Sequence, residues 1–415
     1  MEFIKFIIYL SIYIGLITTT FYILSFKAGS KKEKLFFRDD ELPKVSVLIP
    51  AYNEEETIVK TVKSILASDY PGFEVIVIND GSKDETLKRI KKYAKKINDS
   101  RLKIFDKKNG GKGTALNLGI SKAKGEIVFT MDADTFVEPY SMKEMVRYFK
   151  NPKVMSVTPA MVIHNPKSIL QRIQHIEYVM GLFLRKAFAS LESIYVAPGA
   201  FSAYRKVFFD KYGGYDVGNI TEDLEMALRI QSKGYITENC PDAPAYTVAP
   251  SKFKELLIQR RRWYYGLIKN IVHYRHIFGR KYGDLGLFVL PSAWVAIFFA
   301  VFVTCYLFIK TLFDVHKELL FLQSINFDFS SLASLSWYSI ERSLFLFLSN
   351  PVILFIFVFM ALLVFYIYYA SKKIGRISGL LVNITLFFLF FAILFGFWWV
   401  VSIVYAIFYK ELKWR

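Results

Sequence analysis

Uncharged apolar segments are concentrated at the two ends of this sequence, and they restrict it to a membrane-embedded fold. Residues 6–26 contain no charged side chain and are long enough to cross a bilayer core of about 30 Å as a helix. Similar segments cover roughly residues 285–312, 345–370 and 379–408, with aromatic residues near their ends. We therefore expect four membrane-spanning helices, one before and three after a more polar middle region.

The overall composition agrees with this class of protein. Of the 415 residues, 53% are hydrophobic, including 40 Phe and 26 Tyr, which is too apolar for an ordinary soluble enzyme of this size. A cleaved signal peptide would have a shorter apolar core and a small-residue cleavage site, so we expect residues 6–26 to be retained as a helix. Basic residues after this segment place its carboxyl end in the cytoplasm, namely Lys27, Lys31, Lys32 and Lys34.

The formal net charge of +18 raises the question of a nucleic-acid partner. The basic runs, such as residues 260–262, lie in or beside the middle region, where positive charge fits the cytoplasmic face of a bilayer with anionic lipids. We therefore expect membrane lipids, and no nucleic acid, as partners. The two cysteines, Cys240 and Cys305, provide neither a disulfide framework nor a CxxC zinc site.

The middle region alternates short apolar strands with charged helices. The pattern predicts strands at residues 45–50, 74–78, 102–105 and 126–131, and helices at 54–67, 83–96 and 114–123. This order indicates a parallel β-sheet flanked by helices, with ligands bound at the carboxyl ends of the strands. Residues 166–190 have an amphipathic pattern that fits either a helix on the membrane surface or a helix facing the core.

Polar clusters follow each of the four predicted strands, at residues 51–54, 79–82, 109–112 and 132–134. Each cluster alone could be a helix cap or a turn, but their coincidence at one sheet edge favours a shared site. Asp132 and Asp134 are the most specific, because an extended backbone puts both carboxylates on the same side. Mg²⁺ or Mn²⁺ prefers such oxygen ligands and completes its shell with phosphate oxygens. The sequence therefore predicts a divalent-cation site for a nucleoside diphosphate.

Two further motifs follow, Thr221-Glu222-Asp223 and the QRRRW stretch at residues 259–263. Together with the strand-end clusters they resemble the inverting family-2 glycosyltransferases, in particular the processive membrane branch of hyaluronan, cellulose, chitin and poly-N-acetylglucosamine synthases. The likeness covers residues 43–265. It implies an α/β fold: a GT-A domain, which is a Rossmann-like nucleotide-diphospho-sugar transferase domain. Transmembrane α-helices would be joined to this domain.

The resemblance also implies a role for each motif residue. The donor nucleotide would be bound by Tyr52, Glu54, Asp80, Lys112, Asp132 and Arg262. The cation, Mg²⁺ or Mn²⁺, would be held by Asp132 and Asp134. Asp223 would be the general base that accepts the proton of the acceptor hydroxyl in one inverting displacement. The acceptor would be contacted by Glu222, Gln259 and Trp263, and the stretch at residues 197–205 would lie nearby.

Two of these roles have simpler alternatives. Asp223 also lies at the start of the predicted helix 224–231, where a negative charge interacts favourably with the helix dipole. Trp263 beside basic residues is also typical of the membrane interface.

We expect a membrane helix at residues 1–30, a cytoplasmic glycosyltransferase domain at 31–265, an interfacial connector at 266–284, and a membrane region with about three helices at 285–415. Residues 314–344 fit an external loop or an interfacial helix. The expected location is the plasma membrane, with several spans.

By resemblance, the activity is inverting transfer of a sugar from a nucleotide sugar, a UDP-sugar in the first instance, to a growing polysaccharide, with export of the product. The alternative is a single addition to a membrane lipid such as polyprenyl phosphate, diacylglycerol or a sphingoid acceptor. Because the helices are few, we expect an accessory subunit or a homo-oligomer to complete the export path.

Overall fold

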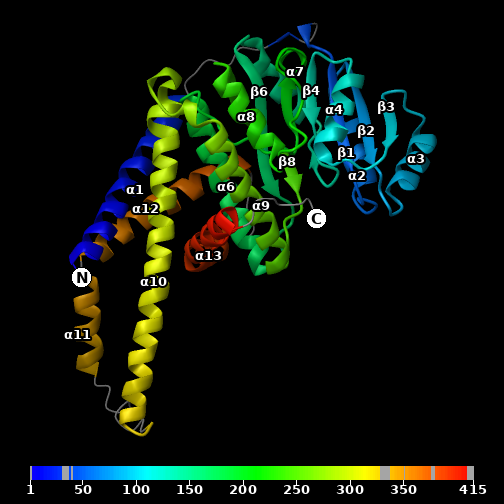
Figure 1. Cartoon of the computed structure of the whole chain (residues 1–415). Coiled ribbons are helices and arrows are strands. Elements are labelled where there is room, and N and C mark those ends of the chain that lie inside the picture. Colours follow the sequence, from blue (N-terminus) through cyan, green and yellow to red (C-terminus); the bar gives the residue numbers. More distant parts are fainter. Residues whose placement is uncertain are drawn as a thin grey trace.

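The computed structural model describes residues 2–29, 37–38, 41–327, 337–349, 351–374 and 379–408. An eight-stranded sheet and its helices form one side of the molecule, and long helices extend from the other side (Figure 1). Lys31, Lys32 and Lys34, which were used to orient the first helix, lie outside the described residues.

The first half of the sheet is parallel, as predicted. Its strand order is β3-β2-β1-β4, with every neighbouring pair parallel. The strands are β1 (Val45–Ala51), β2 (Phe73–Asp80), β3 (Leu102–Lys107) and β4 (Ile127–Thr130). The connecting helices are α2 (Ile58–Leu66), α3 (Thr86–Ile97) and α4 (Lys112–Lys122). Helix α2 begins later than predicted because residues 54–57 form a turn.

The central strands are mostly apolar because helices cover both faces of the sheet. Val47 and Ile49 of β1 pack toward α2 and α3, whereas Leu48 packs toward α4. All three side chains are fully buried. Three further helices add to the helical cover on the two faces of the sheet: α5 (Ser141–Val146), α7 (Lys206–Tyr212) and α8 (Glu222–Ser232).

The second half of the sheet is mixed and was not predicted. Strand β7 (Ser202–Arg205) is antiparallel to both β4 and β6 (Val154–Ile163). Strand β8 (Ile236–Thr247) is parallel to β6, and β5 (Phe136–Val137) closes the edge antiparallel to β8.

Helices α6 (Ile169–Ser190) and α9 (Phe253–His273) connect the sheet to the apolar helices. Helix α6 packs on β6 and β8 on one side and on α1 (Glu2–Gly29), α12 (Pro351–Ile374) and α13 (Leu380–Phe408) on the other. Phe183 of α6, for example, stacks on Phe26 of α1 at 4.1 Å between ring centroids. Helix α6 therefore packs between two layers, as in the predicted core-facing arrangement, and its placement on a membrane surface stays a prediction.

In the part of the chain that the structure describes, three helices are long and apolar enough to cross a membrane: Phe6–Gly29, Leu285–Ser324 and Leu380–Phe408. The predicted span at residues 345–370 contains a shorter apolar helix, Ile353–Tyr369, so the count of four stays a prediction. Two helices occupy much of the predicted external segment, α10 (Leu290–Ser324) and α11 (Trp337–Leu348). The predicted domain boundary at residue 265 lies inside α9.

Candidate active site

Lys112 is the centre of a cluster of acidic residues at the carboxyl edge of the sheet. Its Nζ lies 2.6 Å from Asp132 Oδ1 and 3.3 Å from Glu222 Oε1. Burial alone lowers the pKa of Lys112, but the negative charges of Asp132, Glu222 and Asp223 outweigh it and raise that pKa above its ordinary value. The ammonium group therefore stays charged and holds together segments that are distant in the sequence.

Gly199 provides the close approach that brings Asp223 to this cluster. A Cβ atom at Gly199 would lie 2.8 Å from Asp223 Oδ2 and 3.1 Å from Lys112 Nζ, so the position has no room for a side chain. The Gly199 carbonyl accepts a hydrogen bond from Thr130 Oγ1 at the end of β4 (3.1 Å). Gly199, in the stretch at residues 197–205, thus lies beside the predicted base, and the expected place of this stretch near the acceptor stays a prediction.

Asp132 and Asp134 follow β4, as the sequence indicated. Burial, Asp132 and Glu54 together raise the pKa of Asp134 from 3.8 to about 7, with Lys112 opposing them. A carboxylate in such surroundings fits a divalent cation, which would stabilise its charged form. Among the described residues there is no group of three or more His, Cys, Asp or Glu side chains that could hold a metal. A cation at Asp132 and Asp134 would therefore need further oxygen ligands from diphosphate and water.

Asp80 is 2% exposed and organises the loop that precedes α4. It accepts hydrogen bonds from Gly110 N (3.1 Å), Gly111 N (2.8 Å) and Lys107 Nζ (2.5 Å). Gly111 has a φ of 88°, a conformation that favours glycine, immediately before Lys112 begins the helix. Asp80 thus fixes the position of Lys112, and the predicted nucleoside contacts of Asp80 and Tyr52 stay predictions. Sequence reasoning missed Lys107, because nothing in the motif marks it.

Glu222 and Asp223 occupy the first turn of α8. Asp223 Oδ1 accepts a hydrogen bond from Leu224 N (2.8 Å), while Oδ2 faces Gly199 and the cluster. Asp223 therefore lies in the first turn of α8, where its charge also interacts favourably with the helix dipole. Its second carboxylate oxygen is directed into the site. Burial raises the pKa of Glu222, with Lys112 opposing. Glu222, predicted to contact the acceptor, lies within the same cluster.

The QRRRW stretch lies on α9, which packs against the start of α8. A Cβ atom at Gly266 would lie 2.3 Å from Thr221 Oγ1, so the two helices are in close contact there. Arg262 precedes Gly266 by four residues and so shares its helix face, toward the start of α8. Gln259 Oε1 is buried and has no hydrogen-bond partner among the described residues, as expected of a group that awaits a polar ligand. The acceptor roles of Gln259 and Trp263 stay predictions.

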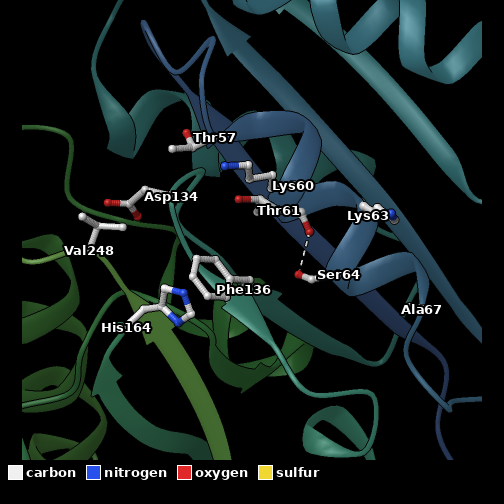
Figure 2. Close-up of a pocket in the computed structure, with 10 residues that line it drawn as sticks. All are labelled: Thr57, Lys60, Thr61, Lys63, Ser64, Ala67, Asp134, Phe136, His164 and Val248. Carbon is white, nitrogen blue, oxygen red and sulfur yellow. Dashed lines mark hydrogen bonds between the residues drawn. The ribbon is translucent and has the colours of Figure 1, made fainter. Parts of the chain in front are cut away.

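A cleft of about 520 Å³ gives access to Asp134 from solvent. Figure 2 shows Asp134, Thr57 and Lys60 at one end and Phe136 and His164 opposite α2. The lining residues are Thr57, Lys60, Thr61, Lys63, Ser64, Ala67, Asp134, Phe136, His164 and Val248. Thr61 Oγ1 donates to the Ala133 carbonyl (2.7 Å), which fixes α2 against the loop between the two aspartates. The sequence did not predict this cleft, because its walls come from unrelated segments.

Comparisons with known proteins agree with this geometry. Residues 46–213 match the family described as Glycosyl transferase family 2. The chain is 34% identical over 261 residues to the poly-beta-1,6-N-acetyl-D-glucosamine synthase of Staphylococcus aureus (strain COL), which is 62% of this chain and 63% of that protein. It is 36% identical over 224 residues to the Staphylococcus epidermidis protein of the same name, 54% of each chain. The chain thus spans less than two thirds of the length of these relatives.

Among solved structures, the mannosyltransferase PcManGT from Pyrobaculum calidifontis, in complex with GDP-Man and Mn²⁺, has a TM-score of 0.59. The two sequences are 18% identical, and the match covers 98% of this chain and 100% of that chain. At that identity the likeness shows the fold, which is GT-A with added apolar helices. Together with the strand-end motifs, these matches confirm the resemblance to the family-2 glycosyltransferases, and residues 46–213 carry the match to that family.

Proposed function

We propose that this protein is a membrane-embedded, metal-dependent, inverting glycosyltransferase. It transfers sugars from a nucleoside diphosphate sugar to a growing polysaccharide. The observation that carries the proposal is the meeting of Lys112, Asp132, Glu222 and Asp223 at one sheet edge. The names of the staphylococcal relatives support a polysaccharide product and make UDP-N-acetylglucosamine the first donor to test. The likeness to PcManGT adds GDP-mannose to the donors that need testing.

The site residues divide into a donor side and an acceptor side. Asp132 and Asp134 would hold Mg²⁺ or Mn²⁺, which when bound neutralises the leaving diphosphate. Lys112, kept charged by its acidic neighbours, would add positive charge at the same place, and Arg262 suits bidentate contact with phosphate oxygens.

Asp223 then performs the proton transfer. Its Oδ1 is fixed by Leu224 N, so Oδ2 is presented to the acceptor hydroxyl and accepts its proton. The hydroxyl oxygen forms a bond to the anomeric carbon from the face opposite the diphosphate, and the bond from that carbon to the diphosphate oxygen breaks. One displacement of this kind inverts the anomeric configuration.

The test is product analysis of the purified full chain. The protein would be incubated with UDP-N-acetylglucosamine, UDP-glucose, UDP-glucuronate or GDP-mannose and either Mg²⁺ or Mn²⁺, with oligosaccharide or polyprenyl phosphate acceptors. We expect metal-dependent nucleotide release with one donor and products longer than a disaccharide. Single addition to a lipid would replace the polysaccharide proposal with its alternative, and no turnover with any donor would contradict both.

We further propose that the chain crosses the plasma membrane several times with the sheet domain in the cytoplasm, where nucleotide sugars are made. The three long apolar helices support this arrangement. An accessory subunit or a second copy would complete the path for an exported product. Crosslinking in native membranes, followed by mass analysis of the adducts, tests that part of the proposal.

A further inference from the structure

We propose that Arg260 is a positioning residue, held in one orientation by its ion pair with Glu177. Arg260 fixes the indole of Trp263 and joins it to the membrane helix α13. The inference rests on the proposed function, since it concerns the acceptor side of the same site. Arg260 lies between Gln259 and Arg262 in the QRRRW stretch, and Glu177 lies on α6.

The ion pair between the two residues is bidentate, with Arg260 buried and Glu177 partly buried. Arg260 Nη1 lies 2.6 Å from Glu177 Oε1, and Nη2 lies 2.7 Å from Oε2. The Arg260 side chain is 2% exposed and that of Glu177 is 19% exposed. Charges this far from water are stable only when they are paired, and two parallel hydrogen bonds fix the plane of the guanidinium. Arg260 therefore has one orientation relative to α6.

The same guanidinium lies against two indole rings. Its Cζ is 4.6 Å from the ring centroid of Trp263 and 5.3 Å from that of Trp398 on α13. Both distances are within the range of cation–π attraction, which is strengthened by burial. Because Arg260 covers one face of Trp263, a sugar could stack only on the opposite face. The ion pair thus selects which face of Trp263 receives the acceptor.

A second aromatic contact fixes α9 to α13 next to this pair. Tyr264 stacks on Trp399 with 4.5 Å between ring centroids and an angle of 6° between the planes. Trp398 and Trp399 are almost completely buried. Two consecutive residues of α13 therefore pack on the QRRRW stretch, and a displacement of α13 would change the setting of Trp263.

The first experiment uses the variants Glu177→Gln and Arg260→Lys in the full chain. Glu177→Gln leaves the guanidinium with a neutral partner, and Arg260→Lys keeps the charge but removes the planar fork. We expect the acceptor KM to rise about tenfold in both variants. The donor KM and the rate of nucleotide release without acceptor should stay within about twofold of the wild type, a split that general destabilisation would not produce.

A second variant protects the test against loss of folding. Replacing both partners at once, with Glu177→Leu and Arg260→Met, removes the buried charges together, a change that often leaves stability intact. We expect this double variant to fold and still to have a raised acceptor KM, because Trp263 is no longer held. An acceptor KM equal to that of the wild type would show that the pair is only structural and would overturn the inference.

A matched control is Glu74→Gln, which breaks a partly buried ion pair with Lys103 (2.5 Å) on β2 and β3. That variant should leave the acceptor KM unchanged. If the wild type releases no nucleotide with any donor, the proposed function fails. If the wild type is active but Glu177→Gln and Arg260→Lys keep a normal acceptor KM, the function stands and the inference fails.

Discussion

Single residues of the acidic cluster have electrostatic properties that can be measured separately. Asp134 is a buried carboxylate near the like charges of Asp132 and Glu54, and both effects raise its pKa. Asp223 is held by its own helix and by the close approach of Gly199. These differences support the proposal that the two aspartates act in different steps, cation binding and proton transfer.

The raised pKa of Asp134 predicts an unusual dependence of stability on pH. Because the folded-state pKa is about 7 instead of 3.8, the folded protein keeps a proton that the unfolded chain loses in this range. The free energy of unfolding without divalent cations should therefore fall as pH rises from about 4 to about 7. Asp134→Asn should remove this fall and raise the free energy of unfolding at pH 8 by roughly 1–4 kcal/mol.

Thermal unfolding of the chelator-treated protein at pH 4 and pH 8 measures this effect. The variant and the wild type should unfold at similar temperatures at pH 4, where both side chains are neutral. Mn²⁺ should raise the unfolding temperature of the wild type at pH 8 and leave the variant unchanged. A wild type that gains stability between pH 4 and pH 7, relative to the variant, would contradict the assignment.

Asp223→Asn and Asp134→Ala separate the two roles. Asparagine at position 223 can still accept the hydrogen bond from Leu224 N, but it cannot take up a proton, so transfer should fall by about 10²–10⁴-fold with donor binding retained. Asp134→Ala should weaken metal-dependent nucleotide binding itself. Calorimetric titration with nucleotide and Mn²⁺, beside the transfer assay, gives both quantities. Equal loss of binding in the two variants would refute this division.

At the scale of elements, the contact between α8 and α9 decides whether the two halves of the site meet. Gly266 of α9 faces Thr221, and Asn270 Nδ2 donates to Thr221 Oγ1 (3.0 Å) one turn later. Tyr274 then donates to Glu225 Oε1 (2.5 Å). One face of α9 is thus fitted along the first turns of α8, which carry Glu222 and Asp223.

Gly266→Ala should disrupt this fit. The added Cβ would lie 2.3 Å from Thr221 Oγ1 and 2.9 Å from Thr221 Cβ, so the helices must separate. We expect a loss of about 1–3 kcal/mol in the free energy of unfolding, together with reduced transfer. The matched control is Gly181→Ala on α6, where the nearest atom, Arg185 Nη1, is 3.4 Å away and the change should be neutral or stabilising. Equal unfolding temperatures for the two variants would contradict the proposed contact.

The elements that sequence could predict are those with a strong local pattern. Strands β1, β2 and β4 are apolar runs buried on both faces, and the polar clusters at their ends followed from parallel pairing. The mixed half of the sheet was missed because β5 has only two residues, and because polar residues or prolines interrupt the apolar pattern of β6, β7 and β8. The Glu177–Arg260 pair also leaves no local signal, because its partners are 83 positions apart.

At the scale of the whole molecule, hydropathy located the apolar segments but not the ends of their helices. The candidate span Leu285–Ser324 has 40 residues, a length of about 60 Å as a helix. A bilayer core is about 30 Å thick, so a helix of this length that crosses it would extend well beyond the hydrocarbon core. Polar residues such as His316 and Lys317 do not break a helix, and for that reason the helix continues past the predicted end at residue 312.

The orientation of the chain can be tested at exposed lysines. With Cys240 and Cys305 replaced, Lys63→Cys on α2 should react with a membrane-impermeant maleimide in inverted vesicles and not in intact cells. Lys317→Cys, near the far end of the long helix, should show the opposite pattern. Labelling of both positions from the same side would contradict the arrangement in which this helix crosses the membrane once.

Lys112 has neighbours that the chain supplies at very different times during synthesis. Asp132 follows it closely, but Glu222 and Asp223 emerge from the ribosome only after β6, α6 and β7. A chain interrupted before α8 would keep Lys112, Asp132 and Asp134 but would lack both Arg262 and the expected proton acceptor Asp223. The charged neighbours of Lys112 are therefore complete only after α8 has packed against the sheet, so the proton acceptor joins the site later than the expected cation ligands.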